Sequence, residues 1–550
     1  AMKYIIADTG ISFAYDYLLN KLELNSTQNI VSIKYNLYEF EKSNDQIFKF
    51  EEINGFGKKL IKKSDKQYKP SPDQLDEADQ WIRSNGGDFS NKYSVFNQIN
   101  INNINNLKLE FKIDLNNKIL KKNWMNNVET NPIFYDGLLY VVTPFKELLA
   151  IDIENQIIKW RFKSLKKIDS RGMTLWVNKK NKKNSCLFVP IRNGIFCVNY
   201  KTGKLNNKLG NNGFIKTGIV RAAPVIWRDN VVVATVNDQK VKIISLIDGI
   251  VTDVINIHPK NRKFKGGSPW GGISLDKKNN LLFLTTGNPR PALIGTSRPG
   301  KNKNANSVIA IDLNKKKILW TFQEVAHDLW DYDIASPPLL AKIKINDNLI
   351  DVVIITTKIG NTLIFDRYSG ISLHDINYIN VPKSDFINEK VSPKQIINLI
   401  PEAFMKLNLS IDDFDNRLIE DKNKIINNID EFNFGTFVPP SFKKNVIVYG
   451  LHGGAQWPGA VFDPYNQNIY LQVNQIPWQL KLYISSDESF PVKMKEAYNL
   501  YDINCSSCHK KNRSGNYKTI DEKNVNYVPS LIKLYDEKFE NFDYFLKKVK

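Results

Sequence analysis

The feature that most constrains the fold of this chain is a short pattern that recurs along it. In the two clearest copies, Leu149–Asp152 leads to Trp160 and Val308–Asp312 leads to Trp320, on the template Ala-x-Asp-x-x-x-Gly-x-x-x-Trp. Weaker copies end in polar turns that are closed by Gly203, Gly249 and Gly370. The copies start near residues 150, 197, 243, 310 and 364, which gives a period of about 45–65 residues.

Each copy consists of an apolar run, a polar turn and a second β-rich run. A repeat of this length and composition is typical of propeller blades, in which each blade is a four-stranded sheet. The sequence therefore predicts an all-β chain built as a β-propeller. Unrelated hairpins that share turn chemistry remain an alternative. Loops between rigid blades are where ligands bind, and the long stretch 255–305, with Gly266–Gly272, is a candidate.

A second motif, Cys505-Ser-Ser-Cys508-His509, lies near the end of the chain. Two thiols at this spacing can add to the vinyl groups of one haem, and the adjacent histidine can bind its iron. The alternatives are half of a zinc site, for which no further ligands lie nearby, and a redox dithiol, for which a βαβ context is missing. The motif predicts covalent c-type haem and a location outside the cytoplasm.

Composition limits the remaining possibilities. The formal net charge is +20, mainly from lysine, which is compatible with a basic face for an acidic redox partner or for peripheral contact with an anionic membrane. Nucleic-acid binding is not expected, because no basic helix or aromatic-basic motif is present. No apolar run is long enough to span a membrane. Cys186 lies at the start of one apolar run and Cys197 at the end of another, and we predict buried thiols there rather than a disulfide.

From Trp81 to Trp478 the chain resembles the pyrroloquinoline quinone (PQQ) dehydrogenases, most closely their membrane-associated sugar and polyol branch. The adjacent Cys-Cys pair of the alcohol-oxidising branch is absent. The resemblance implies an eight-bladed propeller with PQQ on its axis, and some members also carry c-type haem. It rests on ordered segments at Glu129–Tyr140, Ser170–Gly172, Trp270–Asp276, Thr286–Pro289, His327–Asp333, Lys358–Asn361 and His452–Gly459.

The resemblance also implies roles for residues around the cofactor. Trp270 matches the floor under the quinone ring, although it could instead be a core tryptophan. Asn288 and Asp238 match oxygen ligands of a Ca²⁺ or Mg²⁺ ion, with an ordinary turn aspartate as the alternative for Asp238. Arg171 could bind a PQQ carboxylate or form a surface ion pair. Further cofactor contacts are expected from Glu129, Gln456 and Trp457.

For the reaction itself, Asp331 matches the family's general base, which accepts the hydroxyl proton as hydride leaves the carbon. Lys358 matches a cation over the quinone oxygens. The neighbouring Asp328 and Asp333 are expected to hold turns, and the alternative for Asp331 is a similar structural role.

We therefore expect three segments: residues 1–78 without assignment, a β-propeller at 79–490 that is incomplete in this chain, and an α-helical cytochrome c segment at 491–550 that is truncated. The expected function is PQQ-dependent oxidation of a sugar, polyol or alcohol, with electrons passed through haem to a cytochrome or membrane quinone. The expected location is the periplasm or cell envelope. The alternative is a non-catalytic propeller scaffold for envelope protein assembly.

Overall fold

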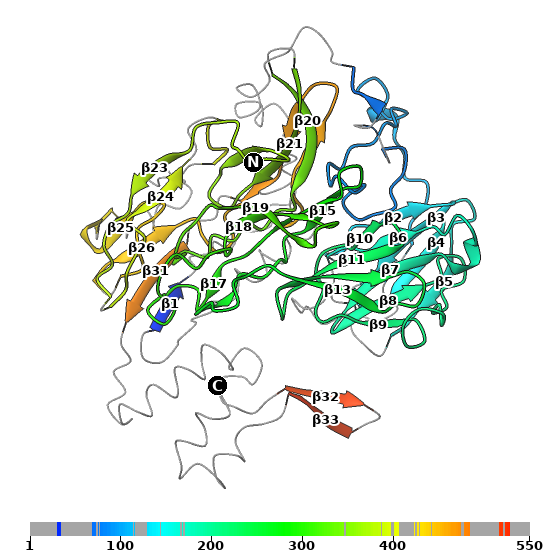
Figure 1. The fold of residues 1–550 in the computed structure, drawn as a ribbon, viewed down its shortest axis with the longest axis horizontal. Coiled ribbons are helices and arrows are strands. Elements are labelled where there is room, and N and C mark those ends of the chain that lie inside the picture. The colour runs from blue at the N-terminus through cyan, green and yellow to red at the C-terminus, as the bar shows by residue number, and fades with distance from the viewer. Residues whose placement is uncertain are drawn as a thin grey trace.

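A computed structural model of the chain describes residues 30–34, most of 69–483 and the hairpin at 516–528, with the longest internal gaps at 116–128 and 406–422. These residues are almost entirely strands and loops, with short 3-10 helices and a few α-helical residues at 423 and 426–427, so the all-β expectation is confirmed (Figure 1). Within this part of the chain no helix is long and apolar enough to cross a membrane. The 3-10 helices are η3 (Ile104–Asn106), η5 (Lys182–Asn184) and η8 (Ile429–Glu431).

Four antiparallel sheets of four strands follow one another, each with its strands in chain order. The first contains β2 (Ile133–Tyr135), β3 (Leu138–Val142), β4 (Leu148–Asp152) and β5 (Ile157–Phe162). The second contains β6 (Thr174–Trp176), β7 (Cys186–Ile191), β8 (Gly194–Val198) and β9 (Phe214–Lys216). The third contains β10 (Val225–Trp227), β11 (Asn230–Thr235), β12 (Lys240–Ser245) and β13 (Val251–Asn256). The fourth contains β15 (Ile273–Asp276), β16 (Leu281–Thr285), β18 (Ser307–Asp312) and β19 (Lys317–Gln323).

The later sheets are less regular. A three-stranded sheet contains β20 (Leu339–Ile345), β21 (Asn348–Thr356) and β22 (Thr362–Asp366). A mixed sheet has the order β1 (Ile30–Lys34), β31 (Trp478–Tyr483), β26 (Asn445–Val448) and β25 (Phe432–Phe434). Two-stranded ribbons pair β14 (Lys265–Gly266) with β17 (Pro289–Arg290), β23 (Asn377–Asn380) with β24 (Lys394–Ile397), β27 (Gly454–Ala455) with β30 (Val473–Asn474), β28 (Val461–Asp463) with β29 (Asn468–Tyr470), and β32 (Asn516–Ile520) with β33 (Lys523–Val528).

The repeat in the sequence corresponds to the third and fourth strands of a blade. Ala150 pairs with Trp160 across β4 and β5, and Ala310 pairs with Trp320 across β18 and β19, with a register shift directly after each alanine. The glycine position of the template holds Gln156 and Lys316 in these copies, with φ of 58° and 57°. The turns of the repeat therefore share a residue with a left-handed backbone conformation, which glycine adopts most readily.

The tryptophan and the glycine of the repeat meet between neighbouring blades. Trp160 donates from Nε1 to the Tyr200 carbonyl at 3.1 Å, and a Cβ on Gly203 would lie 2.7 Å from its ring. Trp320 packs in the same way on Gly370, where that distance is 2.5 Å. A side chain at either glycine would displace the indole, so the spacing of the repeat records the contact between one blade and the next.

A buried segment from Trp81 to Asn91 links the sheets at their first strands. Its carbonyls accept hydrogen bonds from β2, β6, β15, β20 and β28, at distances of 2.8–3.1 Å. The side chain of Arg83 is 1% exposed and donates to the carbonyls of Ala223 and Pro224, directly before β10. Successive apolar clusters fill the spaces between adjacent sheets. This segment therefore fixes the inner edges of consecutive blades, which positions the loops between them.

The prediction of free thiols at Cys186 and Cys197 is wrong, because the two residues form a disulfide. They lie on the adjacent strands β7 and β8, diagonally across the pair, with their Cα atoms 5.1 Å apart. That separation is normal for a disulfide. The sequence pattern predicts that each cysteine is buried. It does not predict the strand register that brings the two cysteines together.

Candidate active site

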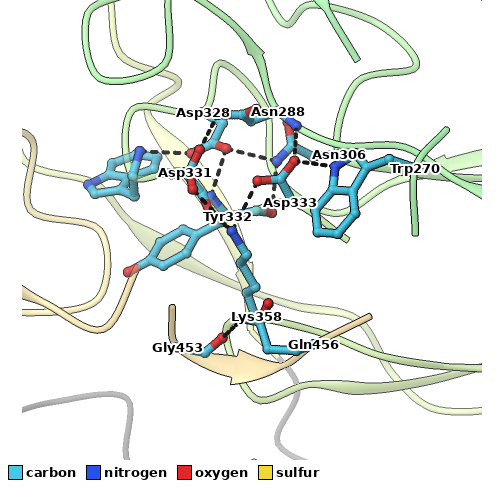
Figure 2. Close-up of polar contacts among 11 residues, drawn as sticks. Trp270, Asn288, Asn306, Asp328, Asp331, Tyr332, Asp333, Lys358, Gly453 and Gln456 are labelled. Carbon is cyan, nitrogen blue, oxygen red and sulfur yellow. Dashed lines mark hydrogen bonds and ion pairs between the residues drawn. The ribbon is translucent and has the colours of Figure 1, made fainter. Parts of the chain in front are cut away.

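The predicted catalytic residues come from two kinds of loop. One kind joins consecutive blades, and the other joins the second and third strands of a blade. Asp331 and Asp333 lie in the loop between β19 and β20, and Lys358 lies in the turn between β21 and β22. Trp270 precedes β15, and Asn288 follows β16. Figure 2 shows these side chains converging on one small region. Antiparallel blades bring these two kinds of loop to the same face, which explains the convergence.

Lys358 holds the two carboxylates together. Its ammonium nitrogen lies 3.1 Å from Oδ2 of Asp331, 3.0 Å from Oδ2 of Asp333 and 2.8 Å from the Asp331 carbonyl oxygen (Figure 2). An ammonium group has three hydrogens, so these three acceptors use all of them. The side chain of Lys358 is 4% exposed, that of Asp333 is 6% and that of Asp331 is 12%. Asp331 is therefore the most accessible acid of the pair.

The three groups perturb one another electrostatically. Burial raises the pKa of Asp331, although the Lys358 ammonium opposes this effect. Burial also acts to raise the pKa of Asp333, but the charge of Lys358 and hydrogen bonds from Trp270 and Asn288 outweigh it and lower that pKa. The two carboxylates raise the pKa of Lys358 against its own burial. Asp331 is the better proton acceptor of the two acids, and Asp333 is the more permanent anion.

Asp333 does more than hold a turn. Its Oδ1 accepts hydrogen bonds from Nε1 of Trp270 at 3.0 Å and from the backbone N–H of Asn288 at 2.8 Å. A Cβ on Gly287 would lie 2.1 Å from this oxygen, so only glycine permits the approach. Sequence reasoning missed this role. The signal was the repeat of aspartate two positions after Asp331, in the same loop.

The expectation for Asp328 agrees with its contacts. Its carboxylate accepts from the backbone N–H groups of Trp330 and Tyr332 and from Nδ2 of Asn306, each at 2.8 Å. It therefore shapes the loop that carries Asp331. The φ of Asp331 is 63°, a left-handed conformation that is costly for any residue with a side chain. Asn288 contacts Asp331 directly, with Nδ2 at 2.5 Å from Oδ1.

A second group of predicted residues meets around Arg171, next to this cluster. The guanidinium carbon of Arg171 lies 4.7 Å from the ring centroid of Trp270 and 5.2 Å from that of Trp457. Oε2 of Glu129 pairs with Nε of Arg171 at 2.9 Å. Gln456 donates to the Gly453 carbonyl at 2.8 Å, and a Cβ on Gly454 would strike the backbone of Lys358. Indole faces with a nearby guanidinium are chemically suited to a planar, anionic ring system such as PQQ.

Asp238 lies apart from the predicted metal partner Asn288. Its carboxylate pairs with Lys242 at 2.9 Å and accepts a short hydrogen bond from Thr235, within one hairpin. These donors outweigh burial and lower the pKa of Asp238. Among the described residues no cluster of three or more histidine, cysteine or acidic side chains is arranged to hold a metal. Asn288 does meet Asp331, with its amide Nδ2 donating to Oδ1 of that carboxylate.

The haem motif, Cys505, Cys508 and His509, lies outside the described residues. Within the expected cytochrome segment, only the backbone hairpin of β32 and β33 is described. The prediction of covalent haem therefore stays a prediction.

Comparison with known proteins supplies an independent test. The sequence profile of the family "glucose/ethanol/alcohol dehydrogenase, beta-propeller domain" matches residues 81–247 and 253–524. Quinoprotein glucose dehydrogenase A of Acinetobacter calcoaceticus is 26% identical over 459 residues, which cover 71% of this chain and 56% of that protein. The glycerol dehydrogenase large subunit of Gluconobacter thailandicus is 24% identical over 438 residues, covering 70% of this chain and 58% of that protein.

A solved structure agrees on the fold. The quinohemoprotein alcohol dehydrogenase of Comamonas testosteroni aligns with a TM-score of 0.52 at 18% identity, over 74% of this chain and 59% of that one. At this identity the likeness concerns the fold alone. The chain spans just over half the length of the curated relatives that it matches.

Proposed function

Because the chain belongs to the glucose/ethanol/alcohol dehydrogenase β-propeller family, we propose that it oxidises a hydroxyl group of a sugar, polyol or alcohol with PQQ. The observation that carries this proposal is the buried triad of Asp331, Lys358 and Asp333 beside the half-buried indole of Trp270. Burying two acids and a lysine costs free energy unless each is paired, and such sites are typical of catalysis.

The proton is accepted by Asp331. As the substrate C–H bond breaks, the hydroxyl proton passes to the Asp331 carboxylate and the carbon becomes a carbonyl. PQQ, when bound, supplies the two-electron acceptor for the departing hydride. Burial raises the pKa of Asp331, which improves it as a base, and its 12% exposure leaves a path for substrate.

Lys358 and Asp333 prepare Asp331 for this step. The ammonium of Lys358 contacts both the carbonyl and the carboxylate of Asp331, which fixes the side chain and keeps it ionised before substrate arrives. Asp333 keeps Lys358 charged and orients the Trp270 indole. This arrangement adds a role to the quinone-facing cation that the family resemblance implies for Lys358.

The cofactor would lie against Trp270, with Arg171, Glu129, Trp457 and Gln456 at its edges. A Ca²⁺ or Mg²⁺ ion would be held by Asn288 and Asp331, whose oxygen donors suit such cations, and it would draw electron density from the cofactor. Asp238 would join them only by leaving Lys242.

We also propose that Cys505, Cys508 and His509 bind a c-type haem that passes electrons to a cytochrome or membrane quinone. One relative, the quinohemoprotein alcohol dehydrogenase of Comamonas testosteroni, combines haem and quinone in its name and is 24% identical over 337 residues. The Cys186–Cys197 disulfide favours an oxidising compartment, which agrees with the periplasm or cell envelope. The propeller at 79–490 and a haem segment at 491–550 remain our proposed division.

The test is activity of the full-length protein loaded with PQQ and Ca²⁺. D-glucose, glycerol and ethanol are offered separately, with reduction of an artificial electron acceptor as the signal. We expect PQQ-dependent turnover of at least one of them. A protein that binds PQQ and oxidises no sugar, polyol or alcohol would favour the alternative, a propeller scaffold for envelope protein assembly, which has no need of the Asp331 triad.

A further inference from the structure

The loop that carries Asp331 has an unfavourable backbone at two points. His327 has φ of 53° and Asp331 has φ of 63°, and neither is glycine. A left-handed residue that carries a side chain is unfavourable, so such residues persist only where surrounding contacts hold them. Lys358 holds the Asp331 end of the loop through its bonds to the carbonyl and carboxylate. The other end, at His327, must be held by different groups.

His327 is held by an acid that lies far along the sequence. Its Nε2 is 2.7 Å from Oε1 of Glu389, and both side chains are 2% exposed. Its Nδ1 lies 2.8 Å from the Gly300 carbonyl oxygen. Oε2 of Glu389 accepts the backbone N–H of Gly295 at 2.5 Å. Glu389 therefore joins the Asp331 loop to the loop between β17 and β18 through both of its oxygens.

Gln395 holds the preceding residue of the loop. Its amide accepts the backbone N–H of Ala326 at 3.0 Å and donates to the Ala326 carbonyl at 2.6 Å, as a neighbouring strand would. The residue is 1% exposed. Apolar contacts from Val381 and Val391 to the cluster around Val325 and Leu329 close the same interface. The segment 381–397 therefore contacts the loop at Val325, Ala326, His327 and Leu329.

We propose that Glu389 and Gln395 are positioning residues that set the geometry of Asp331 by holding its loop at Ala326 and His327. The proposal rests on the proposed function of Asp331 as the base. Neither side chain contacts the Asp331 carboxylate, so their effect passes through the backbone. A shift of about 1 Å in a reacting group can lower turnover by about 10²-fold.

The experiment compares Glu389→Gln, Glu389→Ala and Gln395→Glu in the full-length protein loaded with PQQ and Ca²⁺. Glu389→Gln keeps one carbonyl acceptor, whereas Glu389→Ala keeps none. Gln395→Glu keeps the acceptor for Ala326 but loses the donor. Glu402→Gln, an exposed acid of the same region, is the matched control. The measurements are kcat and KM for whichever of D-glucose, glycerol and ethanol the unaltered protein oxidises, and hydrogen exchange of residues 325–333.

We expect kcat to fall about 10-fold in Glu389→Gln and about 100-fold in Glu389→Ala, with KM changed less than about threefold. Amide exchange in 325–333 should accelerate in the same order, while Glu402→Gln matches the unaltered protein. If Glu389→Ala does not fold, Glu389→Gln and Gln395→Glu decide the question. Lower thermal stability with unchanged kcat and unchanged local exchange would reduce these residues to structural supports.

The exchange measurement also separates this proposal from the proposed reaction. If the unaltered protein oxidises none of the three substrates, the reaction is wrong. Accelerated exchange confined to 325–333 would then still support the positioning role, and unchanged exchange would overturn it.

Discussion

Two predicted parts of the cofactor site differ in how their acidic residues are placed. Asp331 lies in a loop between blades, where its neighbours come from Asn288 and Lys358, on two other connections. Asp238 lies in the hairpin between β11 and β12 and pairs with Thr235 and Lys242 of that same hairpin. The first is a meeting point of distant segments, and the second is satisfied locally.

This difference helps to distinguish acids with a role in the reaction from acids that stabilise a turn. A carboxylate that pairs within its own turn, as Asp238 does, can be explained by the turn alone. The Asp331 cluster has no such local explanation, because Lys358 and Asn288 stabilise nothing in its loop until the propeller is assembled. Buried charges collected from separate elements are retained at a cost to stability, and function is the usual reason.

The sharpest way to break the comparison is to neutralise each acid in turn. We expect Asp331→Asn to keep PQQ bound and to lower kcat by about 10²–10⁴-fold, since the base is lost while shape is kept. The matched variant Asp238→Asn should change kcat by less than about threefold, because its partners are local. In both variants, steady-state dye reduction measures kcat and the absorbance of bound PQQ measures retention of the cofactor. Equal losses in the two variants would mean that the comparison is wrong.

Asp333→Asn should have the next largest effect, and on binding rather than on the proton step. The variant weakens the bonds to Lys358 and the Trp270 indole, and a hydrogen bond to a charged group contributes about 1.5–3 kcal/mol. We therefore expect PQQ affinity to fall about 10–100-fold. Quenching of tryptophan fluorescence during PQQ titration measures it, with Asp312→Asn in an outer turn as control. Unchanged affinity would return Asp333 to a turn-holding role.

The sequence predicted the parts of this site that depend on short motifs. The segment from His327 to Asp333 and the turn at Lys358 each carry their own residues, so a family resemblance could locate them one by one. The roles that were missed belong to pairings between separate strands or loops, namely Asp333 with Trp270, Glu389 with His327, and Cys186 with Cys197. Such pairings depend on strand register and blade order, which a single sequence does not fix. The repeat indicated the blades because the tryptophan of one copy packs on the glycine of the next, as Trp160 does on Gly203 and Trp320 does on Gly370.

Metal removal tests the same comparison, with a smaller expected effect on activity. Chelator-treated protein should lose PQQ-dependent activity, and Ca²⁺ or Mg²⁺ should restore it better than Zn²⁺, because the candidate ligands carry oxygen donors. Asn288→Ala should raise the Ca²⁺ concentration for half-maximal recovery about 10-fold, as loss of one ligand does. Asp238→Asn should raise it less, since Lys242 already neutralises that carboxylate. A larger shift for Asp238 would restore it as the principal ligand.

The smallest expected effect concerns Glu324, a buried acid near the Asp331 loop that has no cation beside it among the described residues. One oxygen accepts from Nδ2 of Asn361 at 2.8 Å, and the other has no hydrogen-bond partner among the described residues. Burial raises the pKa of Glu324 to about 7. The unfolded carboxyl titrates near ~4.3, so between these pH values the folded form holds a proton that the unfolded form has released. The free energy of unfolding therefore falls as pH rises through this window and stays lower above it.

Glu324→Gln keeps the shape and removes the titration, so the variant should be more stable than the unaltered protein at pH 8, by on the order of 1–3 kcal/mol, with little difference near pH 4. Thermal unfolding at the two pH values measures it, and a stability difference that is the same at both would show that Glu324 is ionised in the folded protein, as Asp331 and Asp333 are beside Lys358.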